Sequence, residues 1–334
     1  MIAPVSIIIP IRSEDQAVLE ELLVGLKRQA VLPQEVIFVE ADPKDEVVRA
    51  KGFIKTWWPS NGWEGGDCRV LPNPGVFPGA GRNVGINAAK GEWIAFLDAG
   101  IIPQSNWLSS LLAYAREHKV KAVFGVGRFS GHGAVGRAVC ALSYGEGAIS
   151  PRGILPASLF HREVFEKVGL FLPHLKMHED TQWKDRFSEK PPVNGNALVE
   201  YNHFPKSVAG AVKKWFESGL YAVRAGVKGR QQALYLLGLS GLLASTLFFD
   251  INAVLLVLVV TVFVIRGCLI PMTRSSSWHW WKGEPLSLVA ALPLSLAMDV
   301  AKGAGFLFGY LDKAIGERFS KTDRTNMQSL TGIL

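Results

Sequence analysis

Short apolar runs alternate with helix-like patterns along the first part of the chain. The run Val5–Ile11 is continuous and rich in β-branched residues, which is typical of a strand buried on both faces. Apolar residues then recur at helical spacing between Val18 and Leu26, and Glu35–Glu40 predicts a second strand. A strand, a helix and a strand in close succession predict a βαβ unit, and therefore a parallel sheet covered by helices.

The alternation continues through the middle of the chain. A loop rich in glycine and proline leads into a predicted helix at Arg82–Ala89, and Trp93–Leu97 predicts another buried strand that stops at Asp98. Other segments predict a helix after Pro103, a strand at Ala122–Val126, a helix at His161–Val168 and a turn-rich surface excursion at Trp57–Gly66. The pattern as a whole predicts an α/β domain with a mainly parallel, Rossmann-like sheet.

Long apolar blocks replace this alternation in the C-terminal part. The first two, 233–249 and 251–270, each approach the ~20 residues that span a ~30 Å hydrocarbon core. We therefore expect a hairpin of two transmembrane helices, with a pair of buried core helices as the alternative. A third block, 286–310, is interrupted by Asp299 and Lys302, so it either spans the bilayer or lies along its surface.

Composition and charge agree with this division. The 334 residues are 49% hydrophobic and 19% charged, with a formal net charge of +7. Basic residues flank the apolar blocks without interleaved aromatic residues, so we expect membrane lipids and no nucleic acid as partners. Basic flanks on both sides of the hairpin, and a chain start without a signal-peptide pattern, predict a multi-pass protein of the cell membrane with a cytoplasmic globular domain. Three scattered cysteines argue against a disulfide framework or a structural zinc site.

Polar side chains follow three of the predicted strands. Arg12 comes after the first strand, Glu40 ends the second, and Asp98 follows Leu97. Because ligands of parallel α/β sheets bind beyond the carboxyl ends of the strands, these side chains are expected to line one crevice.

Four segments in a fixed order give the sequence a family resemblance. They are SIIIPIR (Ser6–Arg12), GRNVGINAAKGEWIAFLDAG (Gly81–Gly100), FHREVFEKVGLF (Phe160–Phe171) and HEDTQWKDR (His178–Arg186). Together they resemble the family 2 glycosyltransferases, which have the GT-A fold, over residues 4–225. The resemblance implies a GT-A domain at 1–225, with a donor-binding half at 1–100 and an acceptor half at 101–225. A membrane region at 226–310 and a basic cytoplasmic tail at 311–334 complete the expected organisation.

The resemblance implies a donor site for a nucleotide-sugar, either a UDP-sugar or a GDP-sugar. Glu40 matches the acidic position that contacts the nucleoside, although the family usually has an aspartate there. Arg82 and Asn83 match an Arg-Asn pair lining the nucleotide site, where a guanidinium can neutralise diphosphate charge. Pro10 and Arg12, at the end of the first motif, complete the expected donor-binding set.

The resemblance also implies a divalent cation, Mg²⁺ or Mn²⁺, between protein and donor diphosphate. Asp98 matches the first residue of the family's Asp-x-Asp motif, and His203 resembles a histidine that reaches the metal or the diphosphate. The motif here reads Asp98-Ala99-Gly100, without its last carboxylate. This departure puts the metal requirement in doubt and shifts charge neutralisation toward Arg82.

Asp180 is the expected catalytic residue. It matches the aspartate of the family's Glu-Asp pair, which deprotonates the acceptor hydroxyl in inverting transfer. Glu179 is expected to orient the acceptor or to tune Asp180, since adjacent carboxylates disfavour double ionisation. Trp183 and Arg186 are candidates for acceptor binding, although an aromatic residue in a helix is more commonly part of the core.

The sequence therefore predicts an inverting hexosyltransferase that acts on a membrane-associated acceptor. That acceptor is expected to be a lipid-linked glycan or a cell-envelope polysaccharide precursor. Two alternatives stay open at this point: a polyprenyl-phosphate glycosyltransferase, and a non-catalytic membrane protein that binds nucleotide-sugars.

Overall fold

The computed structural model describes residues 2–12, 15–41, 46–60, 62–245, 247 and 250–315. Two compact units are present: 1–128 with 149–202, and 129–148 with 203–334. The first unit ends at Asn202, so 129–148 and 203–225 group with the C-terminal helices. The functional division into donor and acceptor halves stays a prediction.

An eight-stranded sheet forms the centre of the first unit, in the order β3-β2-β1-β4-β7-β6-β8-β5. Strands β1, β2, β3 and β4 are mutually parallel, whereas β7 pairs antiparallel with both β4 and β6, and β5 pairs antiparallel with β8. The bounds are β1 Ile2–Ile11, β2 Leu32–Glu40, β3 Asp67–Pro72, β4 Trp93–Phe96, β5 Ile101–Pro103, β6 Ala122–Phe129, β7 Ile154–His161 and β8 Val193–Tyr201. The predicted α/β sheet is thus confirmed, whereas β3, β5, β7 and β8 were not predicted.

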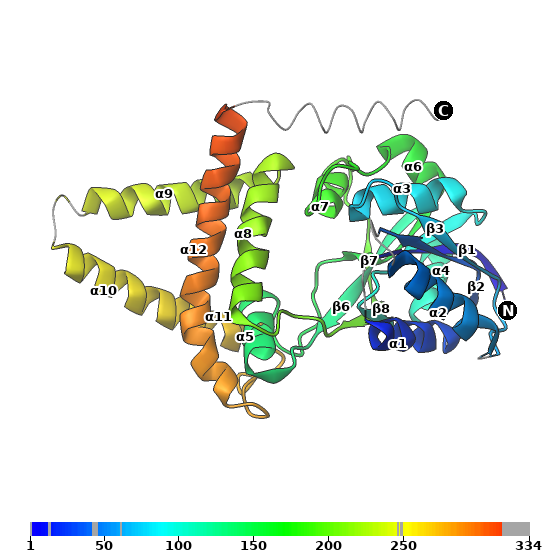
Figure 1. The fold of residues 1–334 in the computed structure, drawn as a ribbon, viewed down its shortest axis with the longest axis horizontal. Coiled ribbons are helices and arrows are strands. Elements are labelled where there is room, and N and C mark those ends of the chain that lie inside the picture. The colour runs from blue at the N-terminus through cyan, green and yellow to red at the C-terminus, as the bar shows by residue number, and fades with distance from the viewer. Residues whose placement is uncertain are drawn as a thin grey trace. The chain divides into compact units, whose positions relative to one another are not determined.

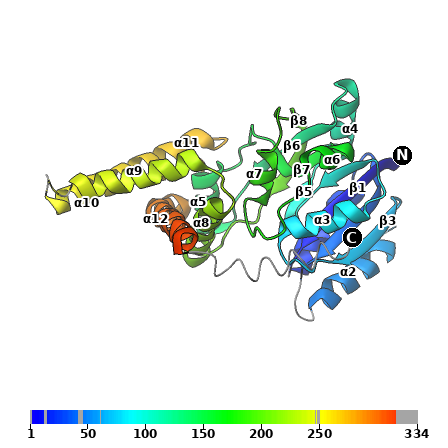
Figure 2. The same cartoon turned by 90° about the horizontal axis from the view of Figure 1, so that it is seen from above.

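Helices cover both faces of this sheet (Figures 1 and 2). Alternate residues of β1 point to opposite faces, so Ile7 and Ile9 belong to one core and Ile8 to the other. The first core includes residues of α1, α2 and α4, and the second includes residues of α3, α6 and α7. These helices are α1 Gln16–Lys27, α2 Glu46–Ser60, α3 Pro78–Ala88, α4 Trp107–Glu117, α6 Glu163–Val168 and α7 Glu179–Lys184.

The surface excursion expected at Trp57–Gly66 is wrong in its first half. Helix α2 continues to Ser60, and Trp57 and Trp58 are both buried. Trp58 packs edge-on against Phe38 of β2, with ring centroids 6.3 Å apart, and lies 4.2 Å from the ring of Trp63. The aromatic residues cover the sheet instead of facing solvent, because their large apolar area is stabilised by burial.

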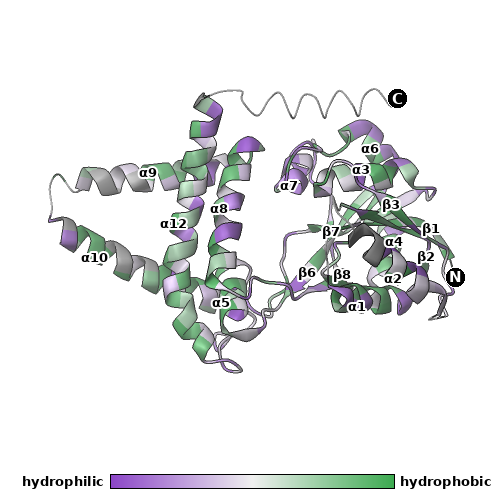
Figure 3. Ribbon diagram, viewed as in Figure 1, coloured by the Kyte–Doolittle hydropathy of each residue, from purple (hydrophilic) through white to green (hydrophobic). Residues whose placement is uncertain are grey.

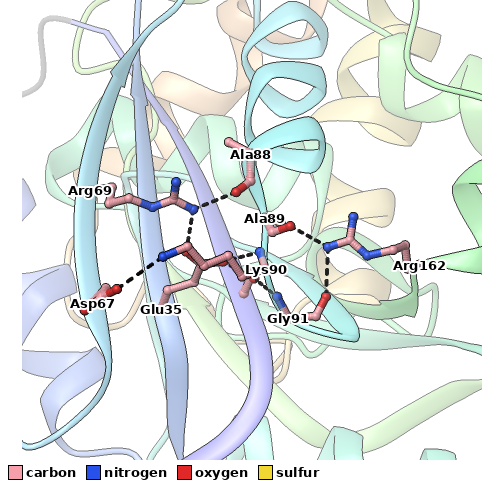
Figure 4. A network of polar contacts seen from close by, with 9 residues as sticks. Glu35, Asp67, Arg69, Ala88, Ala89, Lys90, Gly91 and Arg162 are labelled. Atoms are coloured by element: carbon pink, nitrogen blue, oxygen red, sulfur yellow. Dashed lines mark hydrogen bonds and ion pairs between the residues drawn. The ribbon is translucent and has the colours of Figure 1, made fainter.

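A polar network joins β1, β2 and β3 to the turn between α3 and β4 (Figure 4). Glu35 accepts hydrogen bonds from the Ser6 hydroxyl at 2.6 Å, from Arg69 at 2.5 Å and from the Lys90 backbone N–H at 2.5 Å. Ser6 in turn accepts one from the backbone N–H of Gly91 at 2.8 Å. The network fixes the end of α3 relative to the strands, and therefore the whole helix that carries Arg82.

The second unit is helical. Its elements are α5 Gly133–Ser143, α8 Val208–Arg224, α9 Gly229–Ser245, α10 Ile251–Val262, the π-helical segment η1 Phe263–Leu269, α11 Ile270–Arg274 and α12 Leu286–Ile315. Within the part of the chain that the structure describes, one helix, Leu286–Ala314, is long and apolar enough to cross a membrane. By itself this is weak evidence for membrane association. Figure 3 shows how hydropathy is distributed over these helices.

Candidate active site

Arg82 lies between two carboxylates from distant parts of the chain. Its Nη1 donates to Glu179 Oε1 at 2.6 Å and its Nη2 donates to Asp98 Oδ1 at 2.8 Å. Arg82 is only 3% exposed, and the side chain of Glu179 is 8% exposed, whereas that of Asp98 is 41% exposed. Arg82 therefore forms a bridge of two ion pairs: the one with Glu179 is buried, and the one with Asp98 is partly exposed to solvent.

Close packing of α3 brings Arg82 to this position. A Cβ atom on Gly85 would lie 2.4 Å from Ile8 Cγ2 of β1, so only glycine allows the helix to approach the strand this closely. A Cβ atom on Gly81 would lie 3.5 Å from Pro10 Cβ, which places Pro10 against the first turn of α3. The helix starts at Pro78, one turn before the predicted start at Arg82, because these glycines pack against the sheet and tertiary contacts outweigh their low helix propensity.

The acidic pair stands at the start of α7. Glu179 and Asp180 are its first two residues, and His178 before them has a left-handed backbone with φ of 66°. Val76, in the loop before α3, also has a positive φ of 64°, which is unusual for a β-branched residue. Strained residues of this kind concentrate at functional sites, where the surrounding structure holds them in place.

Asn83 ties α3 to the segment that leads to α7. Its Nδ2 donates to the Phe171 carbonyl at 2.9 Å, and its Oδ1 accepts from the Phe171 backbone N–H at 2.9 Å. Both ends of the amide are thus engaged with one residue of the neighbouring segment. The donor contact expected for Asn83 stays a prediction, and the observed geometry gives it a positioning role beside Arg82.

Trp183 is a core residue in this structure. Its side chain is completely buried, its ring contacts those of Phe160, Phe165 and Phe171, and its indole N–H donates to the Gly169 carbonyl at 2.7 Å. The proposed stacking on an acceptor sugar is therefore incompatible with this geometry. The aromatic residues of α6, β7 and the preceding loop enclose the ring, and its burial in turn fixes α7.

The two carboxylates of the acidic pair have opposite pKa shifts. Burial raises the pKa of Glu179, and the attraction of Arg82 only partly offsets it. Burial would also raise the pKa of Asp180, but Lys184, Arg82 and a hydrogen bond from the Thr181 backbone together hold it below its ordinary value. Asp180 is therefore ionised at neutral pH, and its side chain, 33% exposed, can accept a proton from a bound molecule.

The pKa of Arg82 is raised. Burial alone would lower it, but the charges of Asp98 and Glu179 outweigh that effect. Its guanidinium is accordingly a permanent positive charge at the carboxyl ends of the strands. This end of the sheet also includes Glu40, which is buried and pairs with Ile11 in the parallel register; its backbone carbonyl accepts from the Asn73 backbone N–H at 2.7 Å.

The residues around Asp98 offer few ligands for a divalent cation. Ala99 and Gly100 supply no carboxylate, one oxygen of Asp98 is paired with Arg82, and among the described residues no group of three His, Cys, Asp or Glu side chains is arranged to hold a metal ion. These residues do not fit an Mg²⁺ or Mn²⁺ site of the usual oxygen-rich kind.

The other predicted residues have different surroundings. Arg12 is exposed after β1, and His203 is the first residue of the second unit after β8, so its metal role stays a prediction. Arg186 donates to the Leu170 carbonyl at 2.7 Å and to Gln182 at 2.5 Å. These bonds stabilise α7, and the role of Arg186 in acceptor binding stays a prediction.

Lys184, whose Nζ lies 3.9 Å from Asp180 Oδ2, is a site residue that the sequence analysis missed. Its spacing of four residues from Asp180 on a helix was the available signal.

Comparison with solved structures identifies the fold class. A mannosyltransferase from Pyrobaculum calidifontis, solved in complex with GDP-Man and Mn²⁺, matches with a TM-score of 0.55 and 14% sequence identity, covering 90% of this chain and 87% of that one. A structure of GalNAc-T7 with UDP, GalNAc and Mn²⁺ has a TM-score of 0.45 and 13% identity, covering 65% of this chain and 47% of that one. Comparison with curated protein sequences finds no match. The fold is that of the GT-A glycosyltransferases.

A family model matches the N-terminal part of the sequence. Residues 6–140 match the family described as glycosyl transferase family 2. This match covers less than half of the 334 residues, and together with the GT-A fold it supports a glycosyltransferase, as the sequence motifs predicted. The match includes Arg82 and Asp98 and ends before Glu179 and Asp180, so the roles of the acidic pair depend on the site geometry and on the motif resemblance.

Proposed function

We propose that this protein transfers a sugar, with inversion, from a nucleotide-sugar to a hydroxyl of a membrane-associated acceptor. The observation that carries the proposal is the bridge from Arg82 to Asp98 and Glu179, with the ionised Asp180 next to it. A cation and a carboxylate base at the carboxyl ends of parallel strands are the two groups that displacement at an anomeric carbon requires.

Asp180 is proposed as the general base. Its carboxylate accepts the proton of the acceptor hydroxyl while the hydroxyl oxygen forms a bond to the anomeric carbon. The bond between that carbon and the diphosphate oxygen breaks, and the nucleoside diphosphate leaves with the electron pair. Because the pKa of Asp180 is low, the base is ionised before the acceptor arrives, and proton transfer occurs as the new bond forms.

Arg82 is proposed to neutralise the diphosphate. Its guanidinium can exchange the solvent-facing contact with Asp98 for phosphate oxygens while it keeps the buried contact with Glu179. Glu40, at the end of β2, is the proposed nucleoside contact, and Pro10 and Arg12 complete the donor side. The residues near Asp98 do not fit a metal site, so the assay below tests the predicted requirement for Mg²⁺ or Mn²⁺ by comparing each ion with EDTA.

The acceptor is proposed to be a lipid-linked glycan or a polysaccharide precursor at the cytoplasmic face of the cell membrane. Apolar helices follow the catalytic unit, and exposed leucine and valine side chains are frequent on α9, α10 and α12. Basic residues flank this region in the sequence, including Lys213, Lys228 and Arg230. These features support a multi-pass anchor that keeps the active site close to a membrane-bound substrate.

The experiment is a transfer assay with the full-length protein in liposomes. Radiolabelled UDP- and GDP-sugars are supplied with a membrane lipid extract, in Mn²⁺, in Mg²⁺ or in EDTA, and the product is partitioned between organic and aqueous phases. Labelled product in the organic phase is expected. Label only in water-soluble product would contradict the proposed acceptor, and tight donor binding without turnover would favour a non-catalytic nucleotide-sugar-binding protein.

A further inference from the structure

The helices α9 and α10 form a hairpin with an unpartnered apolar surface. Exposed side chains of the described residues are Leu234, Leu236 and Leu237 on α9, and Leu255, Leu256, Val257 and Val260 on α10. Three consecutive exposed residues on α10 cover more than half of the helix circumference, since each residue turns the helix by about 100°. A protein partner would cover one side of such a helix, whereas a lipid environment surrounds it.

Polar contacts hold the two ends of this hairpin against α12. At the start of α9, Tyr235 donates to Asp299 Oδ1 at 2.8 Å and Gln232 accepts from Tyr310 at 2.5 Å. At the other end, in η1, Arg266 donates to both carboxylate oxygens of Asp299, at 2.7 and 2.9 Å. Beyond these contacts, α9 and α10 extend away from α12, roughly across its axis, in both views of the ribbon (Figures 1 and 2).

This arrangement prevents the hairpin and α12 from both crossing the same bilayer. A hairpin that enters along the membrane normal places α12 in the membrane plane, and an α12 that crosses would place the hairpin in that plane. Length and hydropathy alone favour α12, because among the described helices it is the one long and apolar enough to span. The charged residues within α12 and its packing against α8 argue against a membrane-spanning α12.

Charged groups lie at the middle of α12. Asp299 and Lys302 would be near the bilayer centre if Leu286–Ala314 crossed, where charged side chains are costly. In the hairpin, by contrast, the only charged residue between Arg230 and Arg266 is Asp250, at the connection between the two helices.

The C-terminal half of α12 is also in close contact with α8. A Cβ atom on Gly305 would lie 2.1 Å from the Phe216 carbonyl, and one on Gly219 would lie 2.3 Å from the Lys302 carbonyl. Farther along, Arg224 pairs with Asp312 at 2.8 Å. Helix α8 carries Lys213, Lys214 and Glu217, and a helix this polar does not enter hydrocarbon. The half of α12 that packs on it is therefore held outside the hydrocarbon core.

We propose that the α9–α10 hairpin is the element that inserts into a lipid bilayer with anionic headgroups, and that α12 lies along the bilayer surface. Lys228 and Arg230 at the start of the hairpin, and Arg274 after its end, would face the headgroups. Trp278, which is exposed in the turn before α12, is suited to the same interfacial layer. This inference deepens the membrane attachment of the proposed function and is independent of the transfer chemistry.

The test compares three positions on one face of α12. Val289, Val300 and Leu311 are exposed by 66%, 63% and 45%. They follow one another at intervals of about three helical turns, and the first and last are about 33 Å apart along the axis. Each is replaced by cysteine in the full-length protein, after Cys68→Ala and Cys268→Ala; Cys140 is buried and is retained. Nitroxide labels in liposomes of phosphatidylcholine and phosphatidylglycerol then report depth by collision with oxygen and with a water-soluble nickel chelate.

We expect the labels at all three positions of α12 to lie at one shallow depth, about 5–10 Å into the boundary between headgroups and acyl chains. Labels at Leu237→Cys and Leu256→Cys are expected to lie deeper, and a label at Glu20→Cys on α1 serves as the water-exposed reference. A depth profile that peaks at Val300, near the bilayer centre, would show that α12 crosses and would overturn the proposal. Water exposure of Leu237 and Leu256 equal to that of Glu20 would overturn it as well. Because depth is measured without turnover, either result leaves the proposed transfer activity to its own assay.

Discussion

Arg82 offers the most informative substitution, because one guanidinium neutralises two carboxylates. Arg82→Met keeps the apolar part of the side chain and leaves Glu179 buried without its cation. Breaking a buried pair by removing one partner costs about 3–5 kcal/mol. We expect the lower end, about 3 kcal/mol at pH 7, because Asp98 is 41% exposed and can be solvated, and because Glu179 can take up a proton.

The destabilisation of Arg82→Met should depend on pH with a definite sign. Burial raises the pKa of Glu179 even with Arg82 present, and removing the arginine raises it further. A carboxyl whose pKa is higher in the folded than in the unfolded state binds more protons when folded, so stability falls as pH rises through that range. The difference between Arg82→Met and the wild type should therefore be larger at pH 8 than at pH 5.

Thermal unfolding of the full-length protein in detergent, followed by tryptophan fluorescence, measures this effect. A loss of about 3 kcal/mol corresponds to a fall in Tm of about 6–12 °C for a domain of this size. Arg128→Met, which removes the partly exposed pair with Glu200, is the matched control and should cost less than about 1 kcal/mol. The double variant Arg82→Met/Glu179→Gln should regain stability relative to Arg82→Met. Equal Tm values for Arg82→Met and Arg128→Met, or no recovery in the double variant, would refute the reasoning.

Two further substitutions test the support of the site. Asn83→Ala removes two hydrogen bonds to Phe171 and should cost about 1–3 kcal/mol, and kcat should fall more than donor affinity because α7 is displaced; equal losses in both would point to a direct donor contact. Trp183→Ala should destabilise the protein by about 3–5 kcal/mol in urea or thermal unfolding. A stable Trp183→Ala variant with a raised acceptor KM would instead restore the acceptor-stacking hypothesis.

The sequence could predict three of the four mutually parallel strands, β1, β2 and β4, because runs such as Val5–Ile11 are uniformly apolar and short. The same pattern placed Glu40 and Asp98 at the carboxyl edge. It could not predict β3, β5, β7 and β8, which lack a continuous apolar run of this kind. It also did not predict the burial of Trp57 and Trp58, which lie in the last turn of α2 within a turn-rich composition. In these segments packing against the sheet outweighs local propensity.

The candidate site could be predicted residue by residue but not as an arrangement. Arg82 and Glu179 are separated by 97 positions, and no periodic pattern relates them. Asn83 had a motif that suggested a donor contact, whereas its partner is a backbone amide on a segment with no sequence signal for that contact. Trp183 was ambiguous because helical spacing does not distinguish a helix face that packs against the core from one that faces a substrate.

The most direct test of the central claim is turnover by Asp180→Asn. The wild type, Asp180→Asn and the Arg128→Met control are compared in liposomes at saturating nucleotide-sugar, and donor binding is titrated in parallel. Loss of the general base should lower kcat by about 10²–10⁴-fold while donor binding is retained, with Arg128→Met active. Turnover by Asp180→Asn close to that of the wild type would contradict the assignment of Asp180 as the base and favour an acceptor, such as a lipid phosphate, that already carries its negative charge.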